Sequence, residues 1–480
     1  MEMFDASAID AALPETRMLI GGELVQGDAM LDVINPAIGA PFITVSRASQ
    51  AQAEQAVAAA RGAFPEWAAL PHTHRQQQLV RLADAIAAHA APLARALTRE
   101  QGKPLAEARG EIAWAEGYVR HYATLELHGR TIRDDDEGLT ILRRVPLGVV
   151  VGIVAWNFPV LLACWKIAPA VLAGNTVILK PAPTTPVTSL MLGALCADIF
   201  PAGVVNIVVD DNDLGPLLTS HPDVAKVSFT GSTATGQRIM AGASSTLKRL
   251  TLELGGNDPA IVLDDVDVPA VAERIFGAAF LNCGQVCLAI KRVYVQSAVH
   301  DALCDELVRL AQAVVVDDGL KHGSTIGPIQ NRAQFEKVQA FLARARDEGT
   351  IIAGGEVLDR EGYFMTPAIV RDVSDGDEIV DEEQFGPILP VIRFDDVEDV
   401  IRRVNASPNG LGGSVWSSDT ERAIAVANRV ETGTIWVNQH LAIGPHIPMA
   451  GFRQSGLGVE QSIEGLEEFT QIQVLNVARA

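Results

Sequence analysis

The spacing of apolar residues changes along the chain and divides it into segments of different kinds. Residues 49–120 are rich in alanine, glutamine and charged residues, with apolar side chains at helical spacing, such as Leu79, Leu82 and Ile86. Before them, Arg17–Val25 has two short apolar runs around a glycine pair. We therefore expect a short hairpin followed by several amphipathic helices.

Beyond residue 149, short apolar runs alternate with helical segments. The expected strands are 149–154, 176–179, 204–209 and 226–229, and the expected helices among them are 165–173 and 189–199. This alternation indicates a parallel sheet covered on both faces, with ligands at the carboxyl ends of its strands. A second α/β block spans about 255–453, with helices expected at 301–315, 332–348, 396–406 and 420–430.

One apolar stretch, Val145–Trp165, resembles a membrane span, and Asn157 is its only strongly polar residue. Prolines and glycines interrupt it, which favours a buried strand, a turn and a buried helix. Leu139–Val145 is strand-like. The last ten residues, 471–480, alternate like an edge strand, which usually needs a partner.

Composition limits the compartment and the partners. The 480 residues are enough for two or three domains, and 38 basic against 59 acidic residues give a net charge of −21. Nucleic acids and anionic membranes would be repelled by that charge, so we expect neither as a partner. Five cysteines without paired spacing, and an acidic N-terminus, Met1–Asp5, unlike a signal peptide, indicate a reducing, cytoplasmic location.

Two segments could bind a nucleotide. Phe229–Gly236 follows a strand and opens a helix, where glycines and helix N–H groups suit a phosphate. It matches neither the three-glycine dinucleotide fingerprint nor a P-loop, so an ordinary strand-to-helix turn stays open. Lys180–Pro181 could offer a cation to a ribose or phosphate, although such a pair is common.

Cys287 lies shortly after Gly284–Gln285, where small residues let a substrate approach the backbone, and is a candidate nucleophile. A nucleophilic cysteine must be a partly exposed thiolate, whereas most cysteines are inert core residues, and both interpretations stay open. Cys283 lies four residues earlier and raises the possibility of a metal site or a disulfide. No second Cys/His pair has ligand spacing, so we expect no metal.

Three polar residues stand in settings that suggest a task. Glu253 precedes a double glycine in an apolar run, and a carboxylate there is costly without a partner or a role. The Asn157 amide must find partners or serve as a donor. Glu383, before Phe385, could accept bonds from sugar hydroxyls or be a surface acid.

In combination and order, these segments resemble the motifs of the aldehyde dehydrogenase superfamily over essentially the whole chain. The matching blocks are Trp156–Pro159, Lys180–Pro181, Phe229–Ser232 with Gly236, Glu253–Gly256, Asn282–Cys287, Glu383–Pro387, Gly433–Asn438 and Gln454–Gly458. The resemblance implies an α/β fold with a Rossmann-like cofactor domain, a catalytic α/β domain and a small β oligomerisation arm. The implied boundaries are 1–122 and 142–254 for the dinucleotide-binding domain, 255–453 for the catalytic domain, and 123–141 and 454–480 for the arm.

The resemblance also implies a reaction and residue roles. Cys287 would attack an aldehyde, and the Asn157 amide with the Cys287 backbone N–H would hold the oxyanion. The hemithioacetal would pass a hydride to the nicotinamide of NAD⁺, and Glu253 would activate the water that cleaves the thioester. Lys166 would have a supporting role. The implied cofactor-binding residues are Trp156, Lys180, Pro183, Gly231, Ser232, Gly236, Glu383 and Phe385.

Two positions depart from the family pattern. Many NAD⁺-preferring members have glutamate where this chain has Pro183, and its loss removes a like-charge barrier to a 2′-phosphate. We therefore expect NAD⁺ to be used and NADP⁺ to be tolerated. Met449–Ala450 replaces the usual aromatic-glycine pair and alters the pocket entrance.

The substrate pocket implied by the resemblance is mainly aliphatic. Its expected residues are Leu161, Leu162, Trp165, Val286, Leu288, Ile443 and Met449. No arginine occurs in the loop 439–449, which favours a neutral apolar or aromatic aldehyde over an acidic semialdehyde. His440 and His446 in that loop could bond a phenolic or hydroxyl group, or they could be ordinary surface histidines.

Three different functions stay open beside this one. They are a semialdehyde dehydrogenase acting on an acidic substrate, a CoA-acylating relative, and a catalytically silent structural protein of the same fold. The terminal strand has no obvious partner in its own domain, so we also expect a homodimer or homotetramer.

Overall fold

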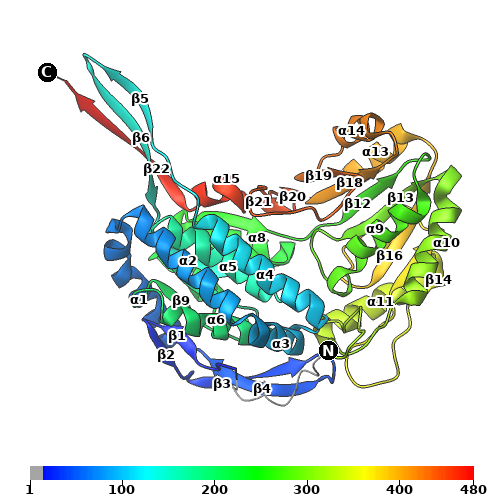
Figure 1. The fold of residues 1–480 in the computed structure, drawn as a ribbon, viewed down its shortest axis with the longest axis horizontal. Coiled ribbons are helices and arrows are strands. Elements are labelled where there is room, and N and C mark those ends of the chain that lie inside the picture. The colour runs from blue at the N-terminus through cyan, green and yellow to red at the C-terminus, as the bar shows by residue number, and fades with distance from the viewer. Residues whose placement is uncertain (1–13, 480) are drawn as a thin grey trace, which may run out of the picture.

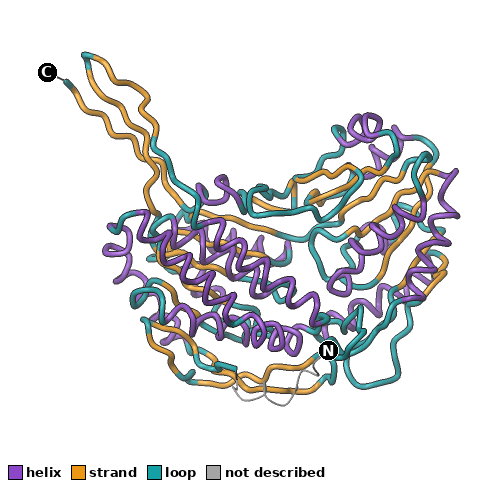
Figure 2. Tube along the Cα trace, in the orientation of Figure 1, coloured by secondary structure: helices purple, strands orange, loops and turns teal. Residues whose placement is uncertain are grey.

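The computed structural model describes residues 14–479. It contains two large β-sheets with helices packed beside them and a projecting three-stranded arm (Figures 1 and 2). The acidic segment Met1–Asp5, which is unlike a signal peptide, lies outside the described residues, as does Ala480.

The first sheet has eight strands in the order β2-β1-β9-β8-β7-β10-β11-β21. Its parallel members are β7 (Val149–Ile153), β8 (Thr176–Lys180), β9 (Val205–Ile207), β10 (Val224–Thr230) and β11 (Arg249–Glu253). The predicted hairpin is confirmed as β1 (Met18–Ile20) and β2 (Glu23–Val25). Strand β1 pairs antiparallel with β9, so the hairpin extends this edge of the sheet. At the other edge lies β21 (Gly456–Leu457).

The predicted amphipathic helices are also confirmed. They are α1 (Gln50–Ala69), α2 (His72–Ala88), α3 (Ala90–Gln101) and α4 (Leu105–Tyr122), followed among the strands by α5 (Pro159–Leu172), α6 (Val187–Ala197), α7 (Gly215–Ser220) and α8 (Thr233–Ala243). Leu79, Leu82 and Ile86 are fully buried, as their spacing predicts. A separate two-stranded ribbon, β3 (Ala29–Asn35) with β4 (Ala40–Arg47), runs along the lower side in Figure 1.

The second sheet has seven strands in the order β14-β15-β16-β13-β12-β18-β19, parallel except for β14. The strands are β12 (Asp258–Val262), β13 (Ile290–Gln296), β14 (Thr350–Ala353), β15 (Ala368–Arg371), β16 (Ile388–Phe394), β18 (Gly412–Trp416) and β19 (Thr434–Val437). The accompanying helices are α9 (Val268–Phe280), α10 (Ser297–Ala313), α11 (Arg332–Glu348), α12 (Glu378–Asp381), α13 (Val397–Asn405) and α14 (Thr420–Ala427). Short β17 (Asn409–Gly410) and β20 (Phe452–Arg453) form a pair, and α15 (Ser462–Glu467) follows.

The arm consists of β22 (Thr470–Ala478), β6 (Gly138–Pro146) and β5 (Arg130–Asp135), which project together from the body in Figure 1. The terminal strand, for which the sequence showed no obvious partner in its own domain, pairs with β6 along its whole length. The pairing joins segments more than 300 residues apart, so no local sequence pattern indicates it. The arm still exposes apolar side chains, among them Ile132, Ile472 and Val474.

The apolar stretch Val145–Trp165 forms the end of β6, strand β7, a turn and the start of α5, as its prolines and glycines predict. Within residues 14–479 no helix is long and apolar enough to cross a membrane. Helix α5 begins at Pro159, whereas the sequence pattern placed its start at Trp165. The early start has a physical cause in the neighbouring helix α4.

Glu111 of α4 provides the cap that α5 lacks locally. Phe158, at the N-cap position, makes no side-chain cap bond. Instead the Glu111 carboxylate accepts from the backbone N–H groups of Val160 and Leu161, at 3.0 and 3.2 Å. The same carboxylate pairs with Lys103 at 2.5 Å, and both side chains are fully buried. A buried ion pair thus fixes the start of α5.

We predict that Glu111→Ala lowers the free energy of unfolding by about 3 kcal/mol or more, because it leaves the Lys103 ammonium buried without its counter-charge. The matched control is Glu116→Ala on the same helix, since Glu116 pairs with Arg120 near the surface. That change is expected to cost less than about 1 kcal/mol. Denaturant unfolding of both variants measures the difference, and equal losses would contradict the structural role of the buried pair.

Candidate active site

A cavity of about 230 Å³ lies between the two sheets, where the carboxyl ends of β7, β10 and β11 meet the segments that follow α9 and α12. Three of the four predicted catalytic residues line it, namely Asn157, Glu253 and Cys287. All seven predicted pocket residues line it as well: Leu161, Leu162, Trp165, Val286, Leu288, Ile443 and Met449. Of the predicted cofactor residues, the cavity wall includes Trp156, Gly231, Ser232, Glu383 and Phe385.

Four predicted site residues do not line the cavity: Lys166, Lys180, Pro183 and Gly236. Several lining residues were not predicted from the sequence, among them Trp114, Phe158, Leu281, Gln334, Lys337 and Leu441. Phe158 and Leu281 lie inside or beside recognised motifs, so their neighbourhood was a usable signal. Trp114 belongs to α4, and helical periodicity gave no sign that its exposed face borders a cavity.

The nucleophile loop, defined here as Leu281–Cys287, begins with an unusual backbone turn. Asn282, Cys283 and Gly284 have φ angles of 51°, 58° and 73°. For residues other than glycine, each such left-handed conformation costs about 1–3 kcal/mol. Gly284 is needed for space as well, since a Cβ there would lie 2.3 Å from the Gly386 carbonyl oxygen. The turn therefore persists only because surrounding groups hold it.

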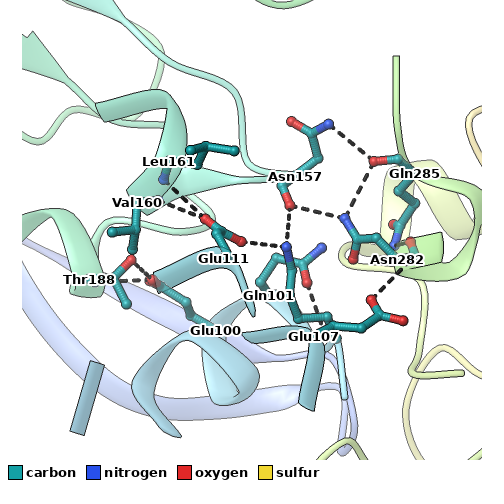
Figure 3. A network of polar contacts seen from close by, with 11 residues as sticks. Glu100, Gln101, Glu107, Glu111, Asn157, Val160, Leu161, Thr188, Asn282 and Gln285 are labelled. Atoms are coloured by element: carbon teal, nitrogen blue, oxygen red, sulfur yellow. Dashed lines mark hydrogen bonds and ion pairs between the residues drawn. The ribbon is translucent and has the colours of Figure 1, made fainter. Parts of the chain in front are cut away.

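Figure 3 shows the groups that hold this turn on the α4 side. The Asn282 backbone N–H donates to the Glu107 carboxylate at 3.0 Å, and its side-chain amide donates to the Asn157 carbonyl oxygen at 2.9 Å. The Lys103 ammonium donates to the same carbonyl oxygen at 2.9 Å. The network that caps α5 is thus continuous with the one that shapes the nucleophile loop.

The Asn157 side chain reaches across to the nucleophile loop. Its Nδ2 donates to the Gln285 carbonyl oxygen at 3.1 Å, while its Oδ1 is buried without a hydrogen-bond partner among the described residues. The amide is 4% exposed and lines the cavity next to Cys287. The second Nδ2 proton is therefore available as a fixed donor at the cavity wall.

The Cys287 thiol and the Glu253 carboxyl are electrostatically linked. Burial raises the pKa of Cys287 well above that of an ordinary cysteine, and the neighbouring Glu253 and Glu383 carboxylates raise it further. Burial also raises the pKa of Glu253, with repulsion from Glu460 adding to it, while Lys166 and a hydrogen bond with Cys287 oppose the rise. The thiol is hence protonated at rest, and Glu253 is placed to take its proton.

Lys166 is fully buried behind the cavity wall, where its ammonium pairs with the Glu460 carboxylate. The Ser228 hydroxyl donates to the same carboxylate oxygen at 3.3 Å. The Glu460 backbone in turn exchanges two hydrogen bonds of 2.8 Å with Met449, a lining residue. Lys166 thus acts on the site through Glu460 and through its charge on Glu253.

The remaining lining suits a dinucleotide. Ser232 caps α8 by accepting from the Thr235 N–H, and the first turn of this helix opens beside Gly231 at the cavity wall. Glu383 accepts from the Gly256 N–H at 3.3 Å, and a Cβ on Gly255 would lie 2.4 Å from its carboxylate. Gly231 leaves room for a pyrophosphate at the cavity wall, and the N–H groups of the first turn of α8 can donate to it.

Two aromatic rings frame the same part of the wall, since Trp156 and Phe385 pack edge to face at 5.3 Å. Gly236 lies in α8 and does not line the cavity. It lets the helix pack closely against Leu254, because a Cβ there would lie 2.6 Å from the Leu254 side chain. Its role in the structure is close packing of α8.

Lys180, at the end of β8, pairs with Asp210 at 2.6 Å, and both side chains are buried. Pro183 follows on the next loop and is partly buried. Asp210 comes from the segment after β9, and no sequence motif marked it. The cation expected to meet a ribose is therefore already matched by a carboxylate.

The expectation that His440 could bond a substrate hydroxyl is wrong. Its ring is fully buried, with Nε2 2.7 Å from the Leu288 carbonyl oxygen and Nδ1 3.0 Å from the Ser414 hydroxyl. Burial lowers the pKa of His440 to about 3, so the ring is neutral. It supports the backbone beside Cys287 and does not line the cavity. His446 is exposed and does not line the cavity either.

Comparisons with known proteins agree with this geometry. The chain is 38% identical over 477 residues to a betaine aldehyde dehydrogenase of Rhizobium leguminosarum, covering 97% of this chain and 98% of that protein. It is 37% identical over 489 residues to a phenylacetaldehyde dehydrogenase of Pseudomonas fluorescens, covering 98% and 97%.

Solved structures match over the full length. A betaine aldehyde dehydrogenase from Staphylococcus aureus in complex with NAD⁺ has a TM-score of 0.96 at 31% identity, covering 99% of this chain and 97% of that one. An Escherichia coli NADP-dependent enzyme has a TM-score of 0.95 at 35% identity, covering 99% and 100%. The sequence profile described as "Aldehyde dehydrogenase family" matches residues 24–475. The chain belongs to the aldehyde dehydrogenase family and is an NAD(P)-dependent oxidoreductase that acts on an aldehyde group.

Proposed function

We propose that this enzyme oxidises a neutral apolar or aromatic aldehyde to the carboxylic acid through a thioester on Cys287. The observation that carries the proposal is the meeting of Cys287, Glu253 and Asn157 in one cavity whose other lining is mainly apolar.

The first step forms a bond between the Cys287 sulfur and the aldehyde carbon. Glu253 takes the thiol proton, since its raised pKa makes it a base matched to neutral pH. The carbonyl oxygen gains negative charge, and the Asn157 Nδ2 and the Cys287 backbone N–H donate to it. A dinucleotide would, when bound, supply the acceptor for the C–H hydride, whose loss would convert the hemithioacetal on Cys287 into the thioester.

The second step releases the product. Glu253 first releases the proton of the first step to solvent and then accepts a proton from a water molecule whose oxygen attacks the thioester carbon. The carbon–sulfur bond breaks, Glu253 returns that proton to the departing Cys287 sulfur, and the acid leaves. Glu253 thus serves both steps from one position, with Lys166 and Glu460 behind it setting its charge.

The lining supports the choice of substrate. The charged residues in the wall are Glu253, Lys337 and Glu383, and no arginine among the described residues lines it. A substrate carboxylate would find no fixed guanidinium there, which disfavours an acidic semialdehyde. A quaternary ammonium is bound over aromatic faces, and two of the rings in the wall already face a lysine. The Phe158 and Phe385 rings have the Lys103 and Lys291 ammoniums 3.8 and 4.9 Å from their centroids.

The same site disfavours a CoA-acylating enzyme and a catalytically silent protein. A CoA-acylating enzyme transfers its thioester to a thiol and has no need of a base for water, whereas Glu253 is positioned for that task. A catalytically silent protein has no need of a costly left-handed turn beside a buried thiol.

We propose that NAD⁺ is used and that NADP⁺ is tolerated. Pro183 removes a carboxylate that would repel a 2′-phosphate, which supports tolerance. The Lys180–Asp210 pair limits it, because the cation nearest to the expected ribose site is already neutralised.

We further propose that the chain forms a homodimer or homotetramer in the cytoplasm. The arm supports assembly, because β22 leaves an unpaired edge and exposes Ile472, Val474 and Val477. The five free cysteines support a reducing compartment.

We predict that Glu253→Gln keeps the amplitude of the NADH burst but slows the burst itself, because the thiol must then lose its proton to a solvent base. Steady-state turnover slows further, about a hundredfold or more, since the thioester forms and water is not activated. Stopped-flow absorbance measures the burst. Cys287→Ala is the matched variant without a nucleophile and should show neither burst nor turnover. A Glu253→Gln enzyme with no burst and normal cofactor binding would contradict the role in product release and place Glu253 in the first step alone.

We predict that phenylacetaldehyde gives a kcat/KM at least about tenfold above those of betaine aldehyde and succinic semialdehyde, because the wall offers mainly apolar surface and no arginine for a carboxylate. Initial rates of NADH formation with the three substrates test this ranking. A preference for succinic semialdehyde would establish an acidic substrate, and a preference for betaine aldehyde would show that a cation is accommodated.

We predict that the native enzyme prefers NAD⁺ over NADP⁺ by less than about a thousandfold, and that Asp210→Asn raises the NADP⁺/NAD⁺ ratio of kcat/KM about tenfold by freeing the Lys180 charge. The matched control is Asp211→Asn, because Asp211 is exposed and lies 3.7 Å from Arg47. Calorimetric titration with each dinucleotide gives the binding contribution independently of turnover. An unchanged ratio in Asp210→Asn would exclude Asp210 as a determinant of cofactor choice.

A further inference from the structure

Lys291 is a buried lysine beside the nucleophile loop that the reaction steps above do not use. It is the second residue of β13, next to the strand that begins at Asp258, and it is 2% exposed. Its ammonium donates to the Gly284 carbonyl oxygen at 2.9 Å, at the end of the left-handed turn. It also lies 4.9 Å from the centroid of the Phe385 ring, which lines the cavity.

This ammonium is poorly satisfied for a buried charge. An ammonium has three N–H donors. Among the described residues, Lys291 donates one hydrogen bond, to the Gly284 carbonyl oxygen. Among the described residues, no carboxylate oxygen lies within 4.0 Å of the Lys291 ammonium, so it forms no ion pair there. A buried cation without a close counter-ion is costly and calls for a negative partner that is present only in part of the reaction cycle.

The acidic groups that face Lys291 are Glu383, Asp258 and the Cys287 thiol, and the cation that faces it is Lys337. Burial raises the pKa of Asp258 to about 8 and also raises that of Glu383, so neither is a permanent counter-ion. The groups that face Cys287 are Glu253, Glu383, Asp258 and Lys291, and Lys291 alone among these four favours the thiolate.

We propose that Lys291 is the buried cation that stabilises the Cys287 thiolate, acting through its charge and not only through its hydrogen bond to Gly284. It is a positioning residue in the sense that it does not contact the substrate. Figure 3 shows other contacts of the loop, in which Glu107 and Asn157 hold Asn282. Lys291 thus completes the support of the nucleophile loop from the second sheet and places a positive charge beneath it.

The inference rests on Cys287 being the nucleophile, but its test does not require aldehyde turnover. The thiolate displaces iodide from iodoacetamide and forms a sulfur–carbon bond, so the alkylation rate reports the thiolate fraction. Peptide mass spectrometry assigns the label to Cys287 separately from the other four cysteines. Failure of the proposed function would appear as aldehyde oxidation by Cys287→Ala, which is a different measurement.

The experiment compares the pH profile of Cys287 alkylation in the full-length protein with that of Lys291→Gln, Lys291→Met and Lys291→Arg. Glutamine removes the charge but keeps a donor for Gly284, methionine removes both, and arginine keeps the charge. Lys321→Met is the control, because Lys321 is exposed and pairs with Asp317 at 3.0 Å on another surface.

The expected result is that the glutamine and methionine variants move the midpoint of the profile up by at least about one pH unit, so that alkylation at pH 7.5 slows about tenfold. The arginine variant and the control keep the native midpoint. A native profile in Lys291→Gln would overturn the proposal and leave Lys291 as a loop support. If the neutral variants fail to fold, judged by thermal unfolding, a shifted midpoint in Lys291→Arg would overturn it and a native midpoint would support it.

Discussion

The active-site cavity depends on three residues of backbone, Asn282–Gly284, being held in a left-handed conformation between two sheets. That turn directs Gln285–Cys287 toward the carboxyl ends of the first sheet, although the loop itself leads into β13 of the second. The conformation is costly for Asn282 and Cys283, so it must be stabilised by contacts from outside the loop. Those contacts come from Glu107, the Asn157 carbonyl and Lys291, which lie in different parts of the chain.

The same contacts set the electrostatics of the site. Lys103 and Glu111 form a buried pair that caps α5 and fixes the Asn157 backbone, so the proposed oxyanion donor is held in place by contacts within the chain. The Cys287 thiol and the Glu253 carboxyl both have raised pKa values because both are buried. A neutral thiol beside a base is less reactive toward stray electrophiles than a resting thiolate, and it can be ionised when the aldehyde binds.

Much of the site could be predicted from sequence because its residues lie within short motifs whose local order is readable. Cys287, Glu253, Asn157 and the aliphatic lining required no knowledge of distant contacts. The start of α5 was misplaced because its cap, Glu111, comes from another helix, and His440 was misassigned because its partner Leu288 is 152 residues away. Lys103, Asp210 and Lys291 were missed for the same reason, since a buried lysine or aspartate looks like a surface charge until the fold supplies its surroundings. Local patterning also did not show that β22 pairs with β6, because strand pairing across more than 300 residues leaves no local pattern. The family resemblance alone grouped 123–141 with 454–480 in one arm.

In the proposed mechanism, Cys287 carries the acyl group between two steps that share one base. It is tested most directly by quenching Glu253→Gln with acid during turnover of phenylacetaldehyde and NAD⁺ and mapping the modified peptide by mass spectrometry. If Cys287 carries the acyl group, one phenylacetyl group per chain is attached at Cys287, and Cys283 is unmodified although it is only four residues away. An acyl group on another residue, or none on a protein that has released NADH, would contradict it.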